Sequence, residues 1–247
     1  MDADPKQRVI VIDDHPVIAS GLPGLVPSLE VLASYPSVEA YLAAPDLAPD
    51  VVLLDLQLST AEDEGSSPPH ASGTEAIRMI LDAGRGPIVI YTSIAEDMLL
   101  AACLAAGAMG AAVKTSPGHT LAEVVRIVAK GKMWVDPAIA GALTRYAQRG
   151  HAGALSPQQA QALRYRGQGL KQQAIAERIG VSDPEVVHRY LKSAVEKLAD
   201  ADLALEAEKD GKHPGARIDE LARKSGLASG LVRWQDLNPA RRRRRPG

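Results

Sequence analysis

The sequence has little cysteine, no long apolar run and no excess of charge of one sign. One cysteine, Cys103, stands among 247 residues, so no internal disulfide can form and a disulfide-built class is excluded. Apolar runs such as those at 51–54 and 87–90 are far shorter than the roughly 20 residues of a membrane-spanning helix. The first residues, MDADPKQR, do not resemble a secretory signal. We expect a cytoplasmic protein of roughly two domains without a membrane segment.

The net charge of -2 conceals an acidic and a basic half. Residues 1–150 carry 10 Lys and Arg against 18 Asp and Glu, whereas residues 151–247 carry 18 against 12. Five of the positive charges form the run 241–245, so the basic half is only weakly positive without it. A basic half indicates contact with a polyanion, usually nucleic acid.

The first half alternates short β-branched runs with longer helical stretches. Strands are expected at 8–13, 29–34, 50–55, 87–92 and 110–114, and helices at 16–22, 37–44, 73–83, 95–106 and 118–130. Continuous apolar strands separated by helices are typical of a parallel sheet covered on both faces, so the fold class is α/β and doubly wound, with the strand order 2-1-3-4-5. Pro23 and Pro27 are expected to break or shorten the first helix. The polar stretch 59–72 is expected to be a long loop or a disordered insertion.

The second half has helical periodicity. Ser156 and Pro157 indicate the start of one helix, a second is expected at 170–179, and a glycine-containing turn leads to a third at 183–198. Short helices joined by such a turn indicate a helix-turn-helix. The expected domains are 1–130, a linker with a helix at 131–154, an all-α helix-turn-helix domain at 155–200, and a charged, partly disordered extension at 201–247.

Polar residues follow the expected strands at one edge of the sheet. Asp13 and Asp14 end the first strand, Asp55 the third, Thr92 the fourth and Lys114 the fifth. The carboxyl ends of parallel strands form the ligand edge of such a sheet. Three carboxylates there repel one another unless a cation neutralises them, and oxygen ligands suit Mg²⁺. A carboxylate nucleophile in this setting can accept a phosphoryl group, with Lys114 and a hydroxyl stabilising its oxygens.

These residues lie in stretches that resemble a known family. VIVIDDHPVIASGL, VVLLDLQL, SGTEAI, IVIYTS and GAMGAAVKTS resemble successive parts of a receiver domain, and the stretch from LSPQQAQALRYRGQG to VVHRYLKSAVEKL resembles a DNA-binding unit. The chain therefore resembles the two-component response regulators with a LuxR/NarL-type helix-turn-helix. The resemblance implies that Asp55 is the phosphoacceptor, that Asp14, Asp55 and the carbonyl of Gln57 ligate Mg²⁺, and that Asp13 acts through water. It also implies that Thr92 is the switch hydroxyl and Lys114 the phosphoryl partner.

Four departures from the family pattern stand out. Near Glu185 and Val187 the family usually has a threonine and then a basic residue, so a carboxylate and an apolar group stand where phosphate or base contacts are expected. Ala111 occupies the position of the usual aromatic switch residue, and the loop after Leu58 is about ten residues longer than usual, which could affect kinase docking or have no effect. Gln158 and Gln159 replace a basic-acidic pair, which predicts a weaker phosphate contact.

The DNA-reading side chains are expected at the start of the third helix of the second half. Val187, His188, Arg189 and Lys192 are the groove-facing candidates, although His188 could equally be a helix residue without such a role. A second set is either a phosphate-binding surface or an ordinary solvated face: Arg164, Arg166, Lys171 and Arg178.

The leading hypothesis is a transcription regulator whose Asp55 takes a phosphoryl group from a histidine kinase, which controls dimerisation and DNA binding; the family resemblance implies a homodimer. Its catalysis would be limited to its own phosphorylation and dephosphorylation, so it is not classed as an enzyme. A phosphatase of the haloacid dehalogenase type would need a second Asp where Gln57 stands. The alternative is a receiver-containing regulator that acts by protein–protein interaction, with weak or no phosphorylation control.

Overall fold

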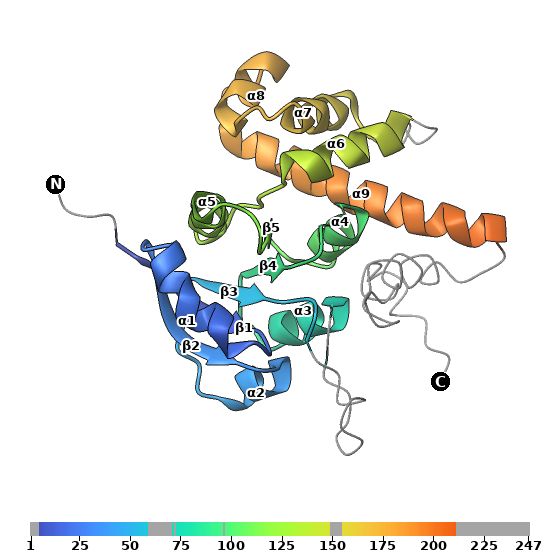
Figure 1. Cartoon of the computed structure of the whole chain (residues 1–247). Coiled ribbons are helices and arrows are strands. Elements are labelled where there is room, and N and C mark those ends of the chain that lie inside the picture. The colour runs from blue at the N-terminus through green and yellow to red at the C-terminus, as the bar shows by residue number, and fades with distance from the viewer. Residues whose placement is uncertain (1–4, 59–70, 72, 96, 149–154, 211–247) are drawn as a thin grey trace. The chain divides into compact units, whose positions relative to one another are not determined.

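The structure is a computed structural model that describes residues 5–58, 71, 73–95, 97–148 and 155–210 (Figure 1). The chain divides into two compact units. The first consists of the described residues of Met1–Ala95 and Gly107–Trp134, and the second of those of Glu96–Ala106 and Val135–Gly247. The expected insertion at 59–72, except Ala71, and the arginine run at 241–245 lie outside the described residues. Among the residues described, no helix is both long and apolar enough to cross a membrane.

Five parallel strands form the sheet of the first unit. Their order is β2-β1-β3-β4-β5, which confirms the predicted sheet class and strand order. The strands are β1 (Gln7–Ile12), β2 (Leu29–Tyr35), β3 (Val51–Leu54), β4 (Ile88–Thr92) and β5 (Gly110–Val113).

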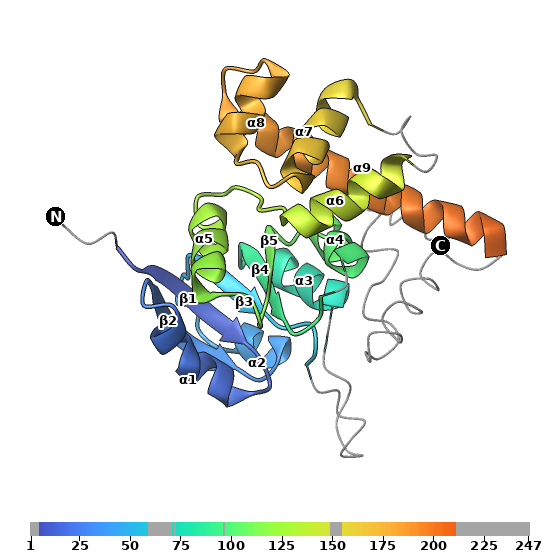
Figure 2. The same cartoon turned by 45° about the horizontal axis from the view of Figure 1, so that its top comes forward.

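Both faces of this sheet are buried. Val9 and Val11 belong to one core cluster together with residues of α1 (Pro16–Leu25) and α5 (Gly118–Val128). Ile10 and Ile12, which alternate with them along β1, are 0% exposed as well. The first unit also contains α2 (Val38–Ala43) and α3 (Gly73–Asp82), which contact each other, and the helices around the sheet can be followed in Figure 2. Burial on both faces explains why the strands are continuous apolar runs in the sequence.

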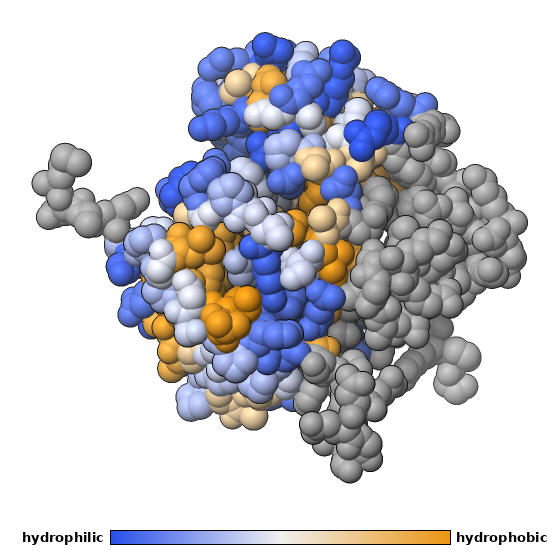
Figure 3. Space-filling view, in the orientation of Figure 1, coloured by the Kyte–Doolittle hydropathy of each residue, from blue (hydrophilic) through white to orange (hydrophobic). Residues whose placement is uncertain are grey.

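The helix α1 corrects one expectation. Pro23 lies inside it, and the helix ends at Leu25, before Pro27. Pro23 is exposed and sits in the last turns, where a carbonyl that loses its helical donor can be solvated. α1 also leaves Val17 71% and Leu25 51% exposed, and hydrophobic residues gather over this helix in Figure 3.

The second unit is entirely helical among its described residues. It contains α4 (Asp97–Ala105), α6 (Pro137–Tyr146), α7 (Pro157–Gly167), α8 (Gln172–Ile179) and α9 (Pro184–Asp210). α8 ends at Gly180 in the left-handed conformation, and a tight turn leads into α9. A helical region therefore follows the sheet, as predicted. α9, however, continues to Asp210 instead of ending near Leu198.

The helix α4 comes from the sequence between β4 and β5 but packs with the second unit. Its contacts are with α6 and α9. All side chains from Leu99 to Leu104 are buried, Cys103 among them. A helix that is apolar on every side is stable only where every side is covered.

Candidate phosphoacceptor site and DNA-binding surface

The strand ends bring the predicted acidic and basic residues together. Asp13 directly follows β1, Asp55 directly follows β3, and the two strands pair in register at Ile12 and Leu54. Lys114, the first residue after β5, extends its ammonium to both carboxylates. Its Nζ lies 2.6 Å from Asp13 Oδ2 and 2.7 Å from Asp55 Oδ2.

Burial makes this charge cluster strongly coupled. Asp13 and Asp55 are each 2% exposed. Burial by itself lowers the pKa of Lys114, but hydrogen bonds to Asp13 and Asp55 and the charges of these two residues outweigh it, so the pKa lies above its ordinary value. Lys114 is therefore a permanent cation between two carboxylates.

His15 belongs to the same site, although sequence reasoning did not select it. Its Nδ1 lies 2.7 Å from Asp14 Oδ1, and its backbone N–H donates to Asp13 Oδ1 at 2.9 Å. Ligand atoms of Asp13, Asp14 and His15 all lie within 4.8 Å of one another, so this edge of the sheet can hold a metal ion. The sequence held one signal for His15, namely that it directly follows the two aspartates; in the structure it is the N-cap residue of α1.

Two further predicted residues lie at this edge. The backbone N–H of Gln57 donates to Asp55 Oδ1 at 3.2 Å, which folds the chain after β3 back over the carboxylate. Thr92, at the end of β4, is fully buried, and its Oγ1 accepts the backbone N–H of Ile94 at 3.4 Å.

The position of the usual aromatic switch is filled by a small residue. Ala111 is buried on β5, paired in register with Ile90 of β4. The nearest candidate for a substitute, Tyr91, is buried in the core cluster shared with α1 and α5. Burial raises the pKa of Tyr91, and the charge of Lys114 opposes the rise. Tyr91 is thus a core residue.

On the second unit, three of the four DNA-binding candidates are exposed. Lys171 precedes α8 as its N-cap residue, and Arg189 and Lys192 lie three residues apart on α9, hence on one face of that helix. The surface over α7 and α8 is mostly hydrophilic in Figure 3.

Two of the groove-facing candidates are interior residues, and those expectations are wrong. Val187 is 0% exposed and His188 is 7% exposed. Val187 begins a buried row that continues through Leu191 and Val195, which is the core face of α9. The ring of His188 is held by Gln172 Nε2, at 2.9 Å and 2.7 Å from its two nitrogens. A side chain buried in this way does not reach a base edge.

Two of the candidate phosphate-binding arginines, Arg166 and Arg178, already contact other groups of the second unit. Arg166 is 6% exposed, and its Nε donates to the carbonyl of Val135 at 2.5 Å, so it fastens the chain before α6 to α7. Arg178 lies over the ring of Tyr165 at 5.5 Å from its centroid. Gln159, which was expected to replace a phosphate-contacting residue, is instead a buried part of the capping box that begins α7.

A parallel sheet with buried carboxylates and a lysine at its carboxyl edge, followed by a helix-turn-helix, defines a response regulator with an output domain. No family model matches the chain. The chain is 30% identical over 200 residues to "Transcriptional regulatory protein YdfI" of Bacillus subtilis, covering 77% of this chain and 89% of that protein. It is 31% identical over 204 residues to "DNA-binding transcriptional activator DevR/DosR" of Mycobacterium tuberculosis, covering 77% and 88%.

A solved structure of the Salmonella typhimurium response regulator RcsB is also similar, with 22% identity, a TM-score of 0.48, and coverage of 79% of this chain and 93% of that one. The chain belongs to the two-component response regulators of the NarL/LuxR type, which are transcriptional regulators.

Proposed function

We propose that phosphorylation of Asp55 by a histidine kinase controls DNA binding by α8 and α9 of this chain. The observation that carries the first half is the contact of Lys114 with both Asp13 and Asp55 at the carboxyl edge of the sheet. A nearly fully buried carboxylate beside a fixed cation lies in a site that is preorganised to carry additional negative charge.

The transfer itself needs few groups. Asp55 Oδ attacks the phosphorus of a phosphohistidine, the P–N bond breaks as the P–O bond forms, and the imidazole leaves with the electron pair. Lys114 keeps its position and pairs with a phosphoryl oxygen instead of the free carboxylate. The Thr92 hydroxyl follows β4 and donates to a second phosphoryl oxygen once the acyl phosphate has formed.

The donor set fits a magnesium ion. Asp13, Asp14 and Asp55, with the main-chain carbonyl of Gln57, offer only oxygen ligands, which Mg²⁺ prefers. When bound, Mg²⁺ would supply positive charge opposite the phosphoryl oxygens. His15, which pairs with Asp14, keeps that carboxylate oriented toward the edge of the sheet.

Labelling of the full chain by acetyl phosphate in the presence of Mg²⁺ tests the proposal that Asp55 accepts the phosphoryl group. Asp55→Asn should abolish labelling, and Asp14→Ala should weaken it by removing a metal ligand. The matched control is Asp82→Asn, which changes an exposed carboxylate paired with Arg78 and should leave labelling unchanged. Full labelling of Asp55→Asn would show that the nucleophile is elsewhere.

The supporting observation for DNA binding is the exposure of Lys171, which precedes α8, and of Arg189 and Lys192 in the N-terminal part of α9. Basic side chains at the start of a recognition helix contact base edges and phosphates. Arg189→Ala should cost about 1–3 kcal/mol at the specific site and relax its sequence preference. Deletion of residues 241–245 should weaken binding to all sequences alike and flatten the salt dependence. Equal loss of affinity at specific and random fragments for Arg189→Ala would contradict a reading role.

Active regulators of this kind would bind DNA as homodimers, and the kinase is the second expected partner. A second candidate function is protein–protein interaction without phosphorylation control, which the small Ala111 favours. The two differ in one measurement. Salt-dependent retention on a promoter fragment supports DNA binding, and its absence, with a protein complex disrupted by substitution of the exposed Glu185, supports the alternative.

A further inference from the structure

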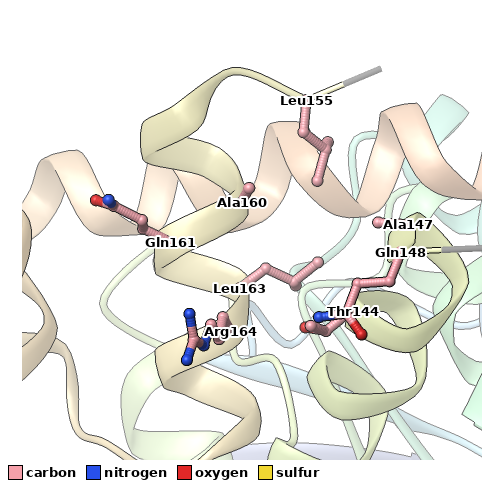
Figure 4. Close-up of a pocket in the computed structure, with 8 residues that line it drawn as sticks. All are labelled: Thr144, Ala147, Gln148, Leu155, Ala160, Gln161, Leu163 and Arg164. Carbon is pink, nitrogen blue, oxygen red and sulfur yellow. The ribbon is translucent and has the colours of Figure 1, made fainter. Parts of the chain in front are cut away.

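A cavity of about 180 Å³ lies between α6 and α7, and the proposed function does not use it (Figure 4). Its described lining comes from the end of α6 and the two residues after it, from Leu155 before α7 and from the middle of α7, all of which belong to the same compact unit. Leu163 and Gln148 extend toward each other from the two helices in Figure 4.

The cavity exists because the two helices are not equally close along their length. A Cβ added to Gly167 would lie 3.0 Å from the Cα and N of Gly141, so the backbones almost touch there. The lining residues Ala147 and Leu155 lie at the other end of this helix pair, toward the chain that joins the two helices. Among the described residues, the two helices are therefore in closest contact at the glycine pair, and the cavity lies beyond it, where small and aliphatic side chains separate them.

The walls of the cavity are apolar, and its rim is cationic. Ala147, Leu155 and Leu163 are buried. Arg164 and Gln148 are exposed at the rim, and among the described residues that line the cavity there is no carboxylate. Within the described part of the chain, Arg164 forms no ion pair, whereas Arg78 is paired with Asp82 and Arg166 with a main-chain carbonyl.

We propose that this cavity binds a small organic anion with an apolar body, of the class of aromatic or short-chain carboxylates. The apolar body lies between Leu155 and Leu163, and the carboxylate pairs with Arg164 and accepts a hydrogen bond from the Gln148 amide. The volume suits a single small ring, since an engineered apolar cavity of about 150 Å³ holds benzene. A ligand that contacts both helices stabilises their packing by mass action.

Benzoate and its uncharged analogue benzyl alcohol are suitable probes of the full chain, with binding followed by calorimetry and by amide chemical shifts. Benzoate should bind saturably with a dissociation constant below about 1 mM, and the shifts should be confined to α6 and α7. Arg164→Gln should weaken benzoate at least tenfold and leave benzyl alcohol unchanged. Ala160→Leu, which fills the cavity from α7, should remove both.

Arg145→Gln is the matched control, because Arg145 is an exposed cation on α6 that does not line the cavity. It should change neither affinity. The proposal is overturned if benzoate does not bind saturably, or if Arg164→Gln weakens benzoate and benzyl alcohol equally. It is also overturned if benzoate does not bind while Arg164→Gln lowers DNA affinity, since Arg164 would then serve a polyanion. If Ala160→Leu does not fold, the Arg164→Gln comparison of the two probes still decides.

Discussion

Replacing Lys114 with Met tests whether the ammonium neutralises the buried carboxylates. The change keeps most of the side-chain volume and removes the only cation in contact with both Asp13 and Asp55 among the described residues. These carboxylate side chains are 1% and 2% exposed, and that of Lys114 is 12% exposed. Solvent therefore screens the three charges weakly.

The expected loss of folding stability follows from the burial of these three side chains. Removing one partner of a buried ion pair typically costs about 3–5 kcal/mol, because the remaining charge is left without compensation. For a chain of this length this corresponds to a decrease in the unfolding temperature of roughly 6–20 °C. Thermal unfolding of the full chain without divalent cations measures it.

Mg²⁺ should partly restore the stability of Lys114→Met, because it supplies the missing positive charge at the same edge of the sheet. A concentration 100 times the dissociation constant would contribute about 2.7 kcal/mol. The increase in unfolding temperature on adding Mg²⁺ should be larger for Lys114→Met than for the unchanged chain. A loss below about 1 kcal/mol, with the same response to Mg²⁺ in both proteins, would refute the reasoning.

The pH dependence has a definite sign. The pKa of Lys114 is raised in the folded state, so the stability from its ion pairs is fully present below the unfolded-state pKa of about 10.4. It is lost as the pH rises through the folded-state value. The difference in stability between the unchanged chain and Lys114→Met should therefore decrease above about pH 10.4, and urea unfolding across this range checks it.

Three further predictions concern other parts of the chain. Gly167→Ala should destabilise the second unit by about 1–3 kcal/mol, because the new Cβ would lie too close to the backbone of Gly141. Gly21→Ala should instead stabilise α1 by about 0.5–1 kcal/mol, because a Cβ there has no neighbour within 4 Å. Urea unfolding of the two variants measures both effects. Cys103 should resist thiol reagents in the folded chain, because burial raises its pKa to about 12, and labelling as fast as in urea would contradict this. Phosphorylation should change dimer fraction or DNA affinity by less than the ~1–3 kcal/mol typical of allosteric coupling, because Ala111 has no ring to move; a larger gain with a phosphoryl mimic would count against it.

The sheet and its acidic edge could be predicted because the signals are local. β1, β3 and β4 are short apolar runs rich in β-branched residues, and a polar residue stands at the carboxyl end of each of them and of β5, so the strand order brings Asp13, Asp55 and Lys114 to one edge. The resemblance to a family then named the roles. His15 was missed because its contact with Asp14 depends on how α1 begins.

The errors in the second unit have a different origin. The apolar row of Val187, Leu191 and Val195 indicates the core face of α9 in the sequence, but His188 and Arg166 are polar residues whose burial the sequence pattern does not indicate. The burial of Arg166 depends on the carbonyl of Val135, which is distant in sequence. Pro23 was misjudged because a proline near the end of an exposed helix disrupts little.

The start of α7 is fixed by the uncharged amide of Gln159. Gln159 accepts the N–H of Ser156, its own N–H donates to Ser156 Oγ, and its amide donates to Ser193 Oγ at 2.9 Å. An amide neither gains nor loses a proton near neutral pH and carries no charge for salt to screen. The Gln159–Ser193 link between α7 and α9 therefore does not depend on a change of protonation near neutral pH, and the Lys197 ammonium, which donates to Gln159 Oε1 at 3.2 Å, adds a charged contact from α9 to the same amide.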